Sequence, residues 1–465
     1  MSKFIALPQH ATAYAPERLK PLVDPVIEKL LYASPHTLVA LVAEHGSPLN
    51  LTWPHALKAN VVALQDVLNK QGVRHEIFYG AKANKSQALI SAAISANIGV
   101  DVSSIHEFQD ALRAGARPDR LCATGPAKTE AFHEALVRNG SLISIDSEEE
   151  FDHLEAIVHR LAPLGKARVL LRYRPSSCNA SRFGMDAKGL LRCLQRITEV
   201  QHLITFDGFH FHLSGYGFTD RAHALSELTP YIDAAREMGL APRMIDIGGG
   251  LPMQYIEPHT YESFLQNNNN ADDYDNNTVP SSFYPYGTAI TACQWLQLFL
   301  DSTCQAALSV AQYLISQDLV LALEPGRSLV DQAAISIFRI TRTKKLANEK
   351  TVIFVEGSSF SACETWFSSE FLIDPILIST QPDEAPTGIT SPAYLAGHSC
   401  LDDDVITHRL INFSVTPKPG DLLVYVNTAG YQMDLLENEF HRHPLPRRMM
   451  ATCCTQENLT FSPDY

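Results

Sequence analysis

Short apolar segments recur at a fixed interval in the first third of the chain, and this spacing limits the folds that it can adopt. Their centres, Phe78, Val100, Cys122 and Ser144, lie 22 residues apart. The residues between them show the apolar spacing of helices over 86–95, 105–114 and 128–138. Strands that alternate with helices are typical of parallel sheets, because each parallel strand needs a crossover connection.

Four further segments continue the pattern and complete a set of eight strands. They cover residues 167–172, 209–213, 244–247 and 320–324. Eight parallel strands that alternate with helices close on themselves, so the sequence predicts an α/β fold with a (β/α)8 barrel of the TIM type.

A barrel of this type carries its chemistry at the carboxyl ends of the strands, with phosphate held by the loops after strands seven and eight. Gly248, Gly249 and Gly250 follow the seventh predicted strand, and Glu324 and Arg327 follow the eighth. Glycines leave backbone N–H groups uncovered, and an arginine offers a planar fork of donors. A glycine run is often only a flexible turn, but this position favours a phosphate cradle.

Lys82 lies in the run Phe-Tyr-Gly-Ala-Lys-Ala-Asn, at the end of the first predicted strand. Burial disfavours the ammonium form of lysine, and a neutral amine can form a Schiff base with a carbonyl group. The alternative is a structural lysine whose aliphatic stem covers an apolar surface.

These motifs, in this order, resemble the fold-type III pyridoxal-phosphate enzymes of the ornithine/diaminopimelate decarboxylase family, over roughly residues 45–450. The resemblance implies pyridoxal 5'-phosphate as cofactor. It also implies a set of cofactor-binding residues: Lys82, Asp101, Arg172, His212, Gly248, Gly249, Gly250, Glu324, Arg327 and Tyr431.

The same resemblance implies the catalytic residues, Lys82, His212 and Cys400. Lys82 would form the Schiff base, His212 would lie against the cofactor ring, and Cys400 would protonate the carbanion. A carboxylate at Glu324 would keep the ring nitrogen protonated, which strengthens the electron sink and favours a decarboxylase over a racemase. Two alternatives stay open: His212 is a structural strand histidine beside His210, or Cys400 is a small buried hydrophobe.

Two departures from the family pattern concern phosphate and substrate. The usual Gly-Ser near His212 reads Ser214-Gly215, so a serine contact with phosphate is in doubt. Leu401 stands where relatives often carry an acid for the distal amine of the substrate. We expect Cys400, Leu401 and Asp404 to contact the substrate.

A leucine cannot pair with an ammonium group, so the expected substrate is a diamino acid or an N-acylated diamino acid, in a pathway such as siderophore or polyamine-like biosynthesis. The alternatives are an amino-acid racemase of the same fold, diaminopimelate decarboxylase in lysine biosynthesis, and a cofactor-binding protein without enzymatic activity.

The length of 465 residues exceeds one barrel and predicts two domains. We expect the barrel over residues 54–335, and a second β-rich domain, itself a β-barrel, from residues 1–53 and 336–465. Segments 36–42, 352–355 and 422–426 read as strands of that domain, and the asparagine-rich stretch 267–277 reads as a solvated insertion.

The net charge of −14 argues against a nucleic-acid partner, and no segment has the roughly 18 apolar residues of a membrane span. The nine scattered cysteines fit a reducing compartment, so a cytoplasmic enzyme is expected. No zinc-ligand spacing appears, and His441 and His443 read as surface residues. The family resemblance implies a homodimer with shared active sites and a small amino-acid substrate.

Overall fold

The computed structural model describes residues 19–162, 165–267, 270–361, 371–380, 392–435, 437–455 and 458–464. They divide into two compact units. One comprises the described residues of 57–252 and 290–329, and the other comprises the described residues of 19–56, 253–289 and 330–464. We call the first the barrel unit and the second the sheet unit, and each is described by itself.

The barrel unit contains a closed ring of eight parallel strands, which confirms the predicted (β/α)8 fold. Each strand pairs with the next, and the last pairs with the first at Ile77 and Leu323. The strands are β2 (His75–Gly80), β3 (Gly99–Val102), β4 (Leu121–Ala123), β5 (Leu142–Ile145), β6 (Ala167–Arg172), β7 (Ile204–His210), β8 (Met244–Asp246) and β9 (Val320–Leu323).

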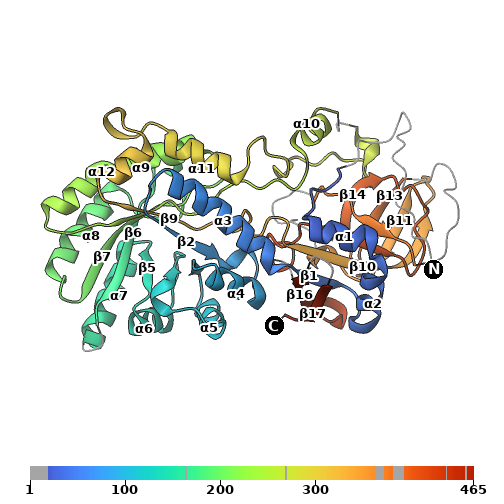
Figure 1. The fold of residues 1–465 in the computed structure, drawn as a ribbon, viewed down its shortest axis with the longest axis horizontal. Helices are drawn as coiled ribbons and strands as arrows, with labels where there is room; N and C mark the ends of the chain where they lie inside the picture. Colours follow the sequence, from blue (N-terminus) through green and yellow to red (C-terminus); the bar gives the residue numbers. More distant parts are fainter. Residues whose placement is uncertain are drawn as a thin grey trace. The chain divides into compact units, whose positions relative to one another are not determined.

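Helices connect these strands and lie outside them (Figure 1). Several begin at a Ser, Thr or Asp whose side chain accepts a backbone N–H of the first turn, as with Ser86 before α4 and Thr129 before α6. The helices are α3 (Pro54–Lys70, in this unit from Leu57 on), α4 (Gln87–Ser95), α5 (Ile105–Arg113), α6 (Glu130–Asn139), α7 (Glu148–Leu161), α8 (Ala187–Glu199), α9 (Phe218–Glu237), α11 (Ala292–Asp301) and α12 (Val310–Ser316).

Apolar side chains fill the barrel interior. One core cluster contains Phe78, Cys122, Leu142, Leu170, Met244 and Ala322. They come from six of the eight strands: β2, β4, β5, β6, β8 and β9. The interior is therefore closed below the carboxyl ends of the strands, and polar chemistry is confined to those ends.

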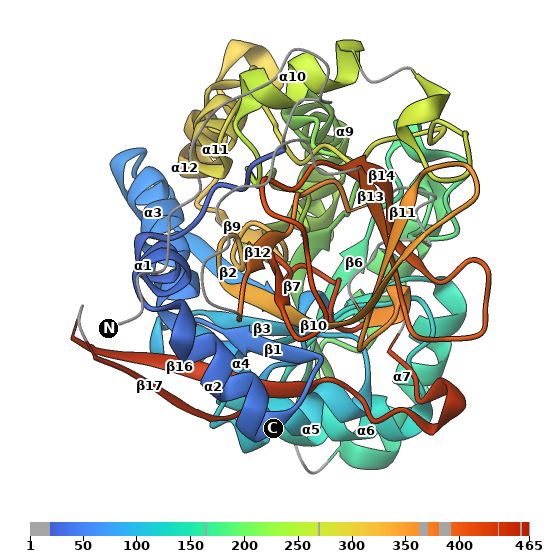
Figure 2. The ribbon, with the colours of Figure 1, turned by 90° about the vertical axis from the view of Figure 1, so that its right-hand side faces the viewer.

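The sheet unit contains a mixed sheet of nine strands, in the order β14-β13-β11-β10-β1-β16-β17, with β15 beside β10 and β12 beside β15. Strand β1 near the N-terminus runs parallel to β16 near the C-terminus, and β16 and β17 form a long pair (Figure 2). The strands are β1 (Leu49–Thr52), β10 (Ala334–Lys345), β11 (Thr351–Val355), β12 (Ile376–Ile378), β13 (Ala393–Ala396), β14 (Val405–Ile411), β15 (Leu422–Val426), β16 (Arg447–Thr455) and β17 (Asn458–Pro463).

Residues 253–289, which the sequence analysis counted with the barrel, pack within the sheet unit. This segment carries α10 (Pro258–Asn267). Tyr255 accepts a hydrogen bond from the backbone of Leu22 at 2.8 Å, and Asp275 bonds the His408 ring at 2.7 Å. The asparagine-rich stretch lies partly here, although Asn268 and Asn269 are outside the described residues.

The strand expected over residues 36–42 is wrong. These residues lie in helix α2 (Pro35–His45), which follows α1 (Pro25–Ala33). Pro35 opens the helix, and Leu38, Leu41 and Val42 are buried at the helical spacing, so a short apolar run hid a 3.6-residue period. No single described helix has the length and apolarity of a membrane span; α1 and α2, bent by 85°, meet that test only as a pair.

Candidate functional site

Lys82 lies in a short 3-10 turn (Ala81–Ala83) directly after β2, at the carboxyl end of the barrel. Its Nζ is 3.5 Å from Oδ2 of Asp101 on the neighbouring strand β3, and its side chain is 36% exposed. The other carboxylate oxygen of Asp101 accepts a hydrogen bond from the Thr124 hydroxyl at 2.7 Å. The lysine is thus anchored at its amine by a buried acid and remains accessible from the barrel mouth.

Three buried carboxylates surround this end of the barrel. Glu324 follows β9, Asp246 ends β8, and Asp101 lies in β3; all are at most 1% exposed. Burial and the Glu324 charge raise the pKa of Asp101 to about 6, and they raise the pKa of Asp246 well above its usual value. Burial likewise raises the pKa of Glu324. Three acids this close are costly without a cationic partner.

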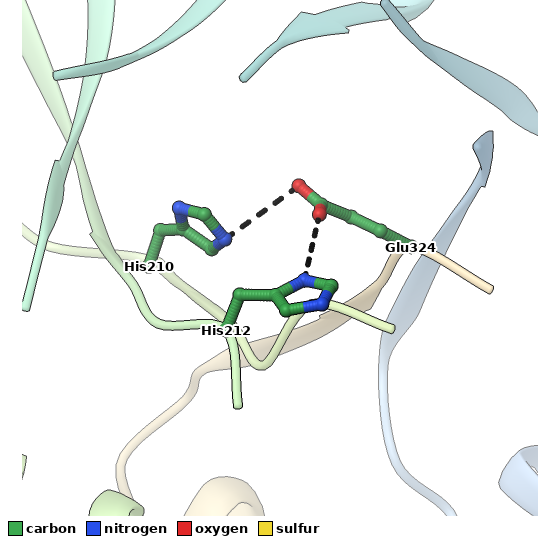
Figure 3. A group of neighbouring side chains, drawn as sticks. All are labelled: His210, His212 and Glu324. Carbon is green, nitrogen blue, oxygen red and sulfur yellow. Dashed lines mark ion pairs between the residues drawn. The ribbon is translucent and has the colours of Figure 1, made fainter. Parts of the chain in front are cut away.

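Two histidines flank Glu324 (Figure 3). His210 Nε2 lies 3.7 Å from one oxygen of Glu324, and His212 Nδ1 lies 3.7 Å from the other. Burial and nearby positive charges lower the pKa values of both rings, so both are neutral at physiological pH. His210 is buried and bonds the Ser144 hydroxyl at 2.6 Å, whereas His212 lies beyond the end of β7 and is partly exposed.

This difference separates the two histidines that the sequence could not tell apart. The predicted strand 209–213 ends at His210, so the two rings are not successive inward residues of one strand. His212 instead accepts the backbone N–H of Gly249 at 3.2 Å. His210 has the structural environment, and His212 is the ring that faces the open end of the barrel.

The glycine loop after β8 packs tightly against these groups. Gly248 has φ +68°, and a Cβ there would lie 2.5 Å from His212 Nδ1. A Cβ on Gly249 would lie 2.6 Å from the Glu324 carbonyl oxygen. Only glycines allow this approach, which brings the loop backbone beside Glu324. Arg327 lies in the loop after β9 and is partly buried.

Arg172 at the end of β6 has a different setting. Its guanidinium donates to Asp146 Oδ1 at 2.7 Å and lies over the Phe183 ring at 4.6 Å from the centroid. The second Asp146 oxygen accepts the Gly184 N–H at 3.2 Å. Arg172 therefore also ties the loop after β6 to the loop after β5.

The four remaining predicted residues, Cys400, Leu401, Asp404 and Tyr431, belong to the sheet unit. Cys400 and Leu401 are exposed, with Leu401 46% exposed. Asp404 is buried, and its two oxygens accept the N–H groups of Ser359 at 2.8 Å and Ser399 at 3.0 Å. The Asp404 carboxylate thus shapes the loop that presents Cys400 and Leu401.

Two further features belong to the sheet unit. The rings of His398 and His443 stack with centroids 3.6 Å apart, at a depression also lined by Ser399 and Phe360. Tyr431 is half-buried and has a left-handed backbone with φ +77°. His443, which read as a plain surface residue, therefore has a ring partner.

Sequence reasoning missed four residues of this region. Thr124 bonds Asp101, and Asp146 bonds Arg172. Ser144 bonds His210, and Asp246 is buried like Asp101 and Glu324. Asp246 gave a signal, because it is an acid at the end of an apolar strand that precedes the glycine run. The others are common residue types that become informative only through long-range contacts.

The donor atoms of this region also lie close enough to hold a metal ion. One group is His210, His212 and Glu324, and the other is Asp101, Cys122 and Glu324; within each group the ligand atoms lie within 4.8 Å of one another. Glu324 belongs to both groups.

Comparisons with known proteins agree with the barrel fold and with the residues at its carboxyl end. Residues 57–278 match the family model described as pyridoxal-dependent decarboxylase, pyridoxal binding domain. The sequence is 52% identical to the uncharacterized protein y4yA of Sinorhizobium fredii over 449 residues, 96% of each chain. It is 23% identical to diaminopimelate decarboxylase of Zymomonas mobilis over 431 residues, 89% of this chain and 90% of that one.

A solved structure shows the same fold. The diaminopimelate decarboxylase of Helicobacter pylori, complexed with L-lysine, superposes with a TM-score of 0.69 at 19% sequence identity. The superposition covers 91% of this chain and 95% of that chain, so both units take part in the likeness.

Proposed function

We propose that this chain, which belongs to the fold-type III decarboxylases that depend on pyridoxal phosphate, removes the α-carboxylate of a diamino acid with a modified distal amine. The observation that carries the proposal is the buried Glu324 carboxylate. It lies beside the buried acid Asp246, and the two rings that flank its oxygens, at 3.7 Å, are neutral, so no cation of the described residues pairs with it. A buried carboxylate without a cationic partner is costly, so the site suits a ligand that brings a cationic N–H.

The barrel residues fit pyridoxal phosphate on these grounds. Glu324 would accept a hydrogen bond from the protonated ring nitrogen, and Lys82 would bind the aldehyde carbon covalently. His212, neutral and partly exposed, would lie against the ring. The glycine loop and Arg327 would hold the phosphate. The loop has no space for a Cβ at its three glycines.

When bound, pyridoxal phosphate supplies an electron sink for the electron pair that remains as carbon dioxide departs. Glu324 would keep the proton on the ring nitrogen. Asp101, through its contact with Lys82 Nζ, would orient this amine for its exchange with the substrate amine. Cys400 would return a proton to the α-carbon of the product. A carboxylate at position 324 favours this decarboxylation over racemisation, which needs a weaker electron sink.

The substrate proposal rests on the loop of residues 397–404. Leu401 presents an exposed apolar side chain where a pairing acid would suit a free ammonium, and the neighbouring depression is lined by the stacked His398 and His443 rings. These groups suit an acylated or otherwise neutral distal end. We infer a biosynthetic role, such as siderophore or polyamine-like assembly.

Diaminopimelate decarboxylation is the second candidate. It is favoured by the names of the relatives in Zymomonas mobilis and Helicobacter pylori. The Asp404 carboxylate does not argue for it, because backbone N–H groups occupy both of its oxygens.

Carbon dioxide release from a substrate panel tests the proposal. Purified protein is first scanned for an absorbance band that is lost in Lys82→Ala, and then supplied with free and N-acylated diamino acids. The proposal expects the band and turnover of acylated substrates. Turnover of meso-diaminopimelate or free ornithine at ordinary rates, without turnover of acylated analogues, would contradict the proposed substrate class. The absence of the band in wild-type protein supplied with pyridoxal phosphate would contradict the proposed enzymatic function.

We also propose a cytoplasmic homodimer in which Cys400 completes the active site of the partner subunit. Mixing the inactive variants Lys82→Ala and Cys400→Ala would then restore activity, because one hybrid site holds both intact residues. Random exchange of subunits predicts about a quarter of the wild-type activity. No recovery in mixtures that demonstrably exchange subunits would show that each chain completes its own site.

A further inference from the structure

One cation near the glycine loop belongs to none of the groups above. Arg221 lies in the first turn of α9, and its side chain is completely buried. The guanidinium donates only to backbone carbonyls: those of Leu213 at 2.8 Å, Gly215 at 3.1 Å, Gly217 at 2.9 Å and Gly249 at 2.9 Å.

The charge of Arg221 lacks a counter-charge at contact distance. Among the residues that the structure describes, no carboxylate forms an ion pair with it, and the other close group is the Trp295 ring at 5.4 Å. Burial lowers the pKa of Arg221 to about 10, so the group remains a cation at neutral pH. It also lies at the amino end of a 20-residue helix, where the helix dipole is positive. The buried positive charge and the helix dipole both favour a nearby anion.

The carbonyls that Arg221 binds come from two loops at the carboxyl end of the barrel. Leu213, Gly215 and Gly217 follow β7, and Gly249 belongs to the glycine loop after β8. A peptide group points its N–H away from its C=O. Carbonyls drawn toward Arg221 therefore turn the following N–H groups, such as those of Ser214 and Gly250, to the opposite side, and neither donates to another described residue.

The packing leaves no room for change at this point. A Cβ on Gly250, which has φ +80°, would clash with Arg221 Nη2. Trp295 adds a second support, because its indole N–H donates to the Tyr216 carbonyl in the same loop at 2.6 Å. The two loops are thus built around the guanidinium.

We infer that Arg221 is a positioning residue for the phosphate group of pyridoxal phosphate, acting from behind the two loops by orienting their N–H groups and supplying a buried positive charge. This inference rests on the proposed function. It gives a physical reason for the shifted Ser214-Gly215 pair: a buried cation strengthens a cradle whose usual serine contact is displaced.

The test compares ligands with and without phosphate on the apo form of the full-length protein. Pyridoxal phosphate, pyridoxal and inorganic phosphate are titrated separately, with tryptophan emission and thermal stabilisation as readouts. Arg221→Gln should weaken pyridoxal phosphate binding about tenfold or more, because a charge-assisted interaction is lost. It should remove the stabilisation by inorganic phosphate and change the pyridoxal affinity by less than about twofold.

Arg236→Gln is the matched control. Arg236 lies in the last turn of the same helix and donates to the Gln317 carbonyl at 2.8 Å, away from both loops. It should leave all three affinities unchanged. If Arg221→Gln weakens pyridoxal and pyridoxal phosphate equally, or neither, the inference is wrong.

Arg221→Lys carries the same test if Arg221→Gln does not fold. It keeps the positive charge but loses the planar fork of donors. Its affinity for phosphate should therefore be lower than that of wild type and of the Arg236→Gln control, but not completely lost. Its affinity for pyridoxal should be unchanged. Equal losses for both ligands again overturn the inference. Wild type that fails to bind pyridoxal phosphate would contradict the proposed function, whereas a phosphate response that depends on Arg221 would still support the anion site.

Discussion

The two ends of the barrel handle buried charge in opposite ways. Toward the amino ends, Asp207 lies 2.8 Å from Arg168 and 2.7 Å from Arg243, and Glu76 lies 2.6 Å from Arg120. At the carboxyl ends, Arg172 pairs with Asp146 and Lys82 lies near Asp101, but no arginine or lysine of the described residues forms an ion pair with the buried Glu324, which raises the pKa of its acidic neighbours. The acids at the amino ends thus have arginines of the chain as partners, whereas Glu324 suits a cationic group of a ligand.

The comparison teaches where stability and function separate in this fold. Acids at the amino ends should contribute to the free energy of unfolding and leave catalysis unchanged. Acids at the carboxyl ends should support catalysis and destabilise the protein when the cofactor is removed. Substitutions at each end can break or sharpen this contrast.

Glu324→Gln should have the largest effect. Without a carboxylate at the ring nitrogen the electron sink weakens, and kcat should fall about 10²-fold or more, as for loss of one preorganised electrostatic group. The apo protein should become more stable, because a buried charge is removed. Steady-state carbon dioxide release and thermal melting of the apo protein measure the two effects, and a variant with wild-type kcat would remove Glu324 from the mechanism.

Asp101 should make the apo protein less stable as pH rises. Its pKa is about 6 in the folded protein and 3.8 in the unfolded reference, so the folded state binds the extra proton between these values. The contribution to stability is complete below about pH 4 and falls by about 3 kcal/mol as pH rises through 6.

Urea unfolding of the apo protein from pH 4.5 to 7.5 checks this prediction, with Asp101→Asn as the comparison. The variant lacks the titrating group, so the difference from wild type should grow in its favour as pH rises. A constant difference across that range would show that Asp101 has an ordinary pKa.

Asp207→Asn should destabilise the protein without affecting catalysis. The carboxylate is buried, but the two arginines remain partly exposed, so we expect a loss of about 2 kcal/mol, below the value for a fully buried pair. The melting temperature should fall while kcat stays within about twofold of wild type. An unchanged melting temperature would mean that these ion pairs contribute nothing.

Glu76→Gln should have the smallest effect. Both Glu76 and Arg120 are partly exposed, and such pairs contribute about 0.5 kcal/mol, less at high salt. Denaturant unfolding at low and high ionic strength measures the difference. A salt-independent loss would point to packing of the Glu76 side chain and not to its charge.

The sequence predicted the barrel because its evidence is local. The even spacing of Phe78, Val100 and Cys122 and the glycine run after the seventh strand are visible without distant contacts. Helix α2 was misread because its local pattern is ambiguous. A run of a few apolar residues fits both the helical and the strand spacing, and only Pro35 at its start indicates a helix.

The site was predictable where residue type alone signals chemistry, as with Lys82, Glu324 and the glycines. Arg221 was not, because an arginine in a helix normally reads as a solvated charge. Its importance comes from complete burial and from carbonyls contributed by two separate loops, which no sequence window contains.

The parallel pairing of β1 with β16 has a consequence for how the protein is made. Leu49 pairs with Arg447, so β1 cannot complete this pairing until β16, one of the last strands to be synthesised, has left the ribosome. The barrel, complete by Leu329, is available to fold before then. Pairing between distant segments is slow because chain entropy is lost first. Strand β10 can pair with β1 earlier, but we expect the β16 side of β1 to remain an open edge during synthesis, when the nascent chain is most open to aggregation.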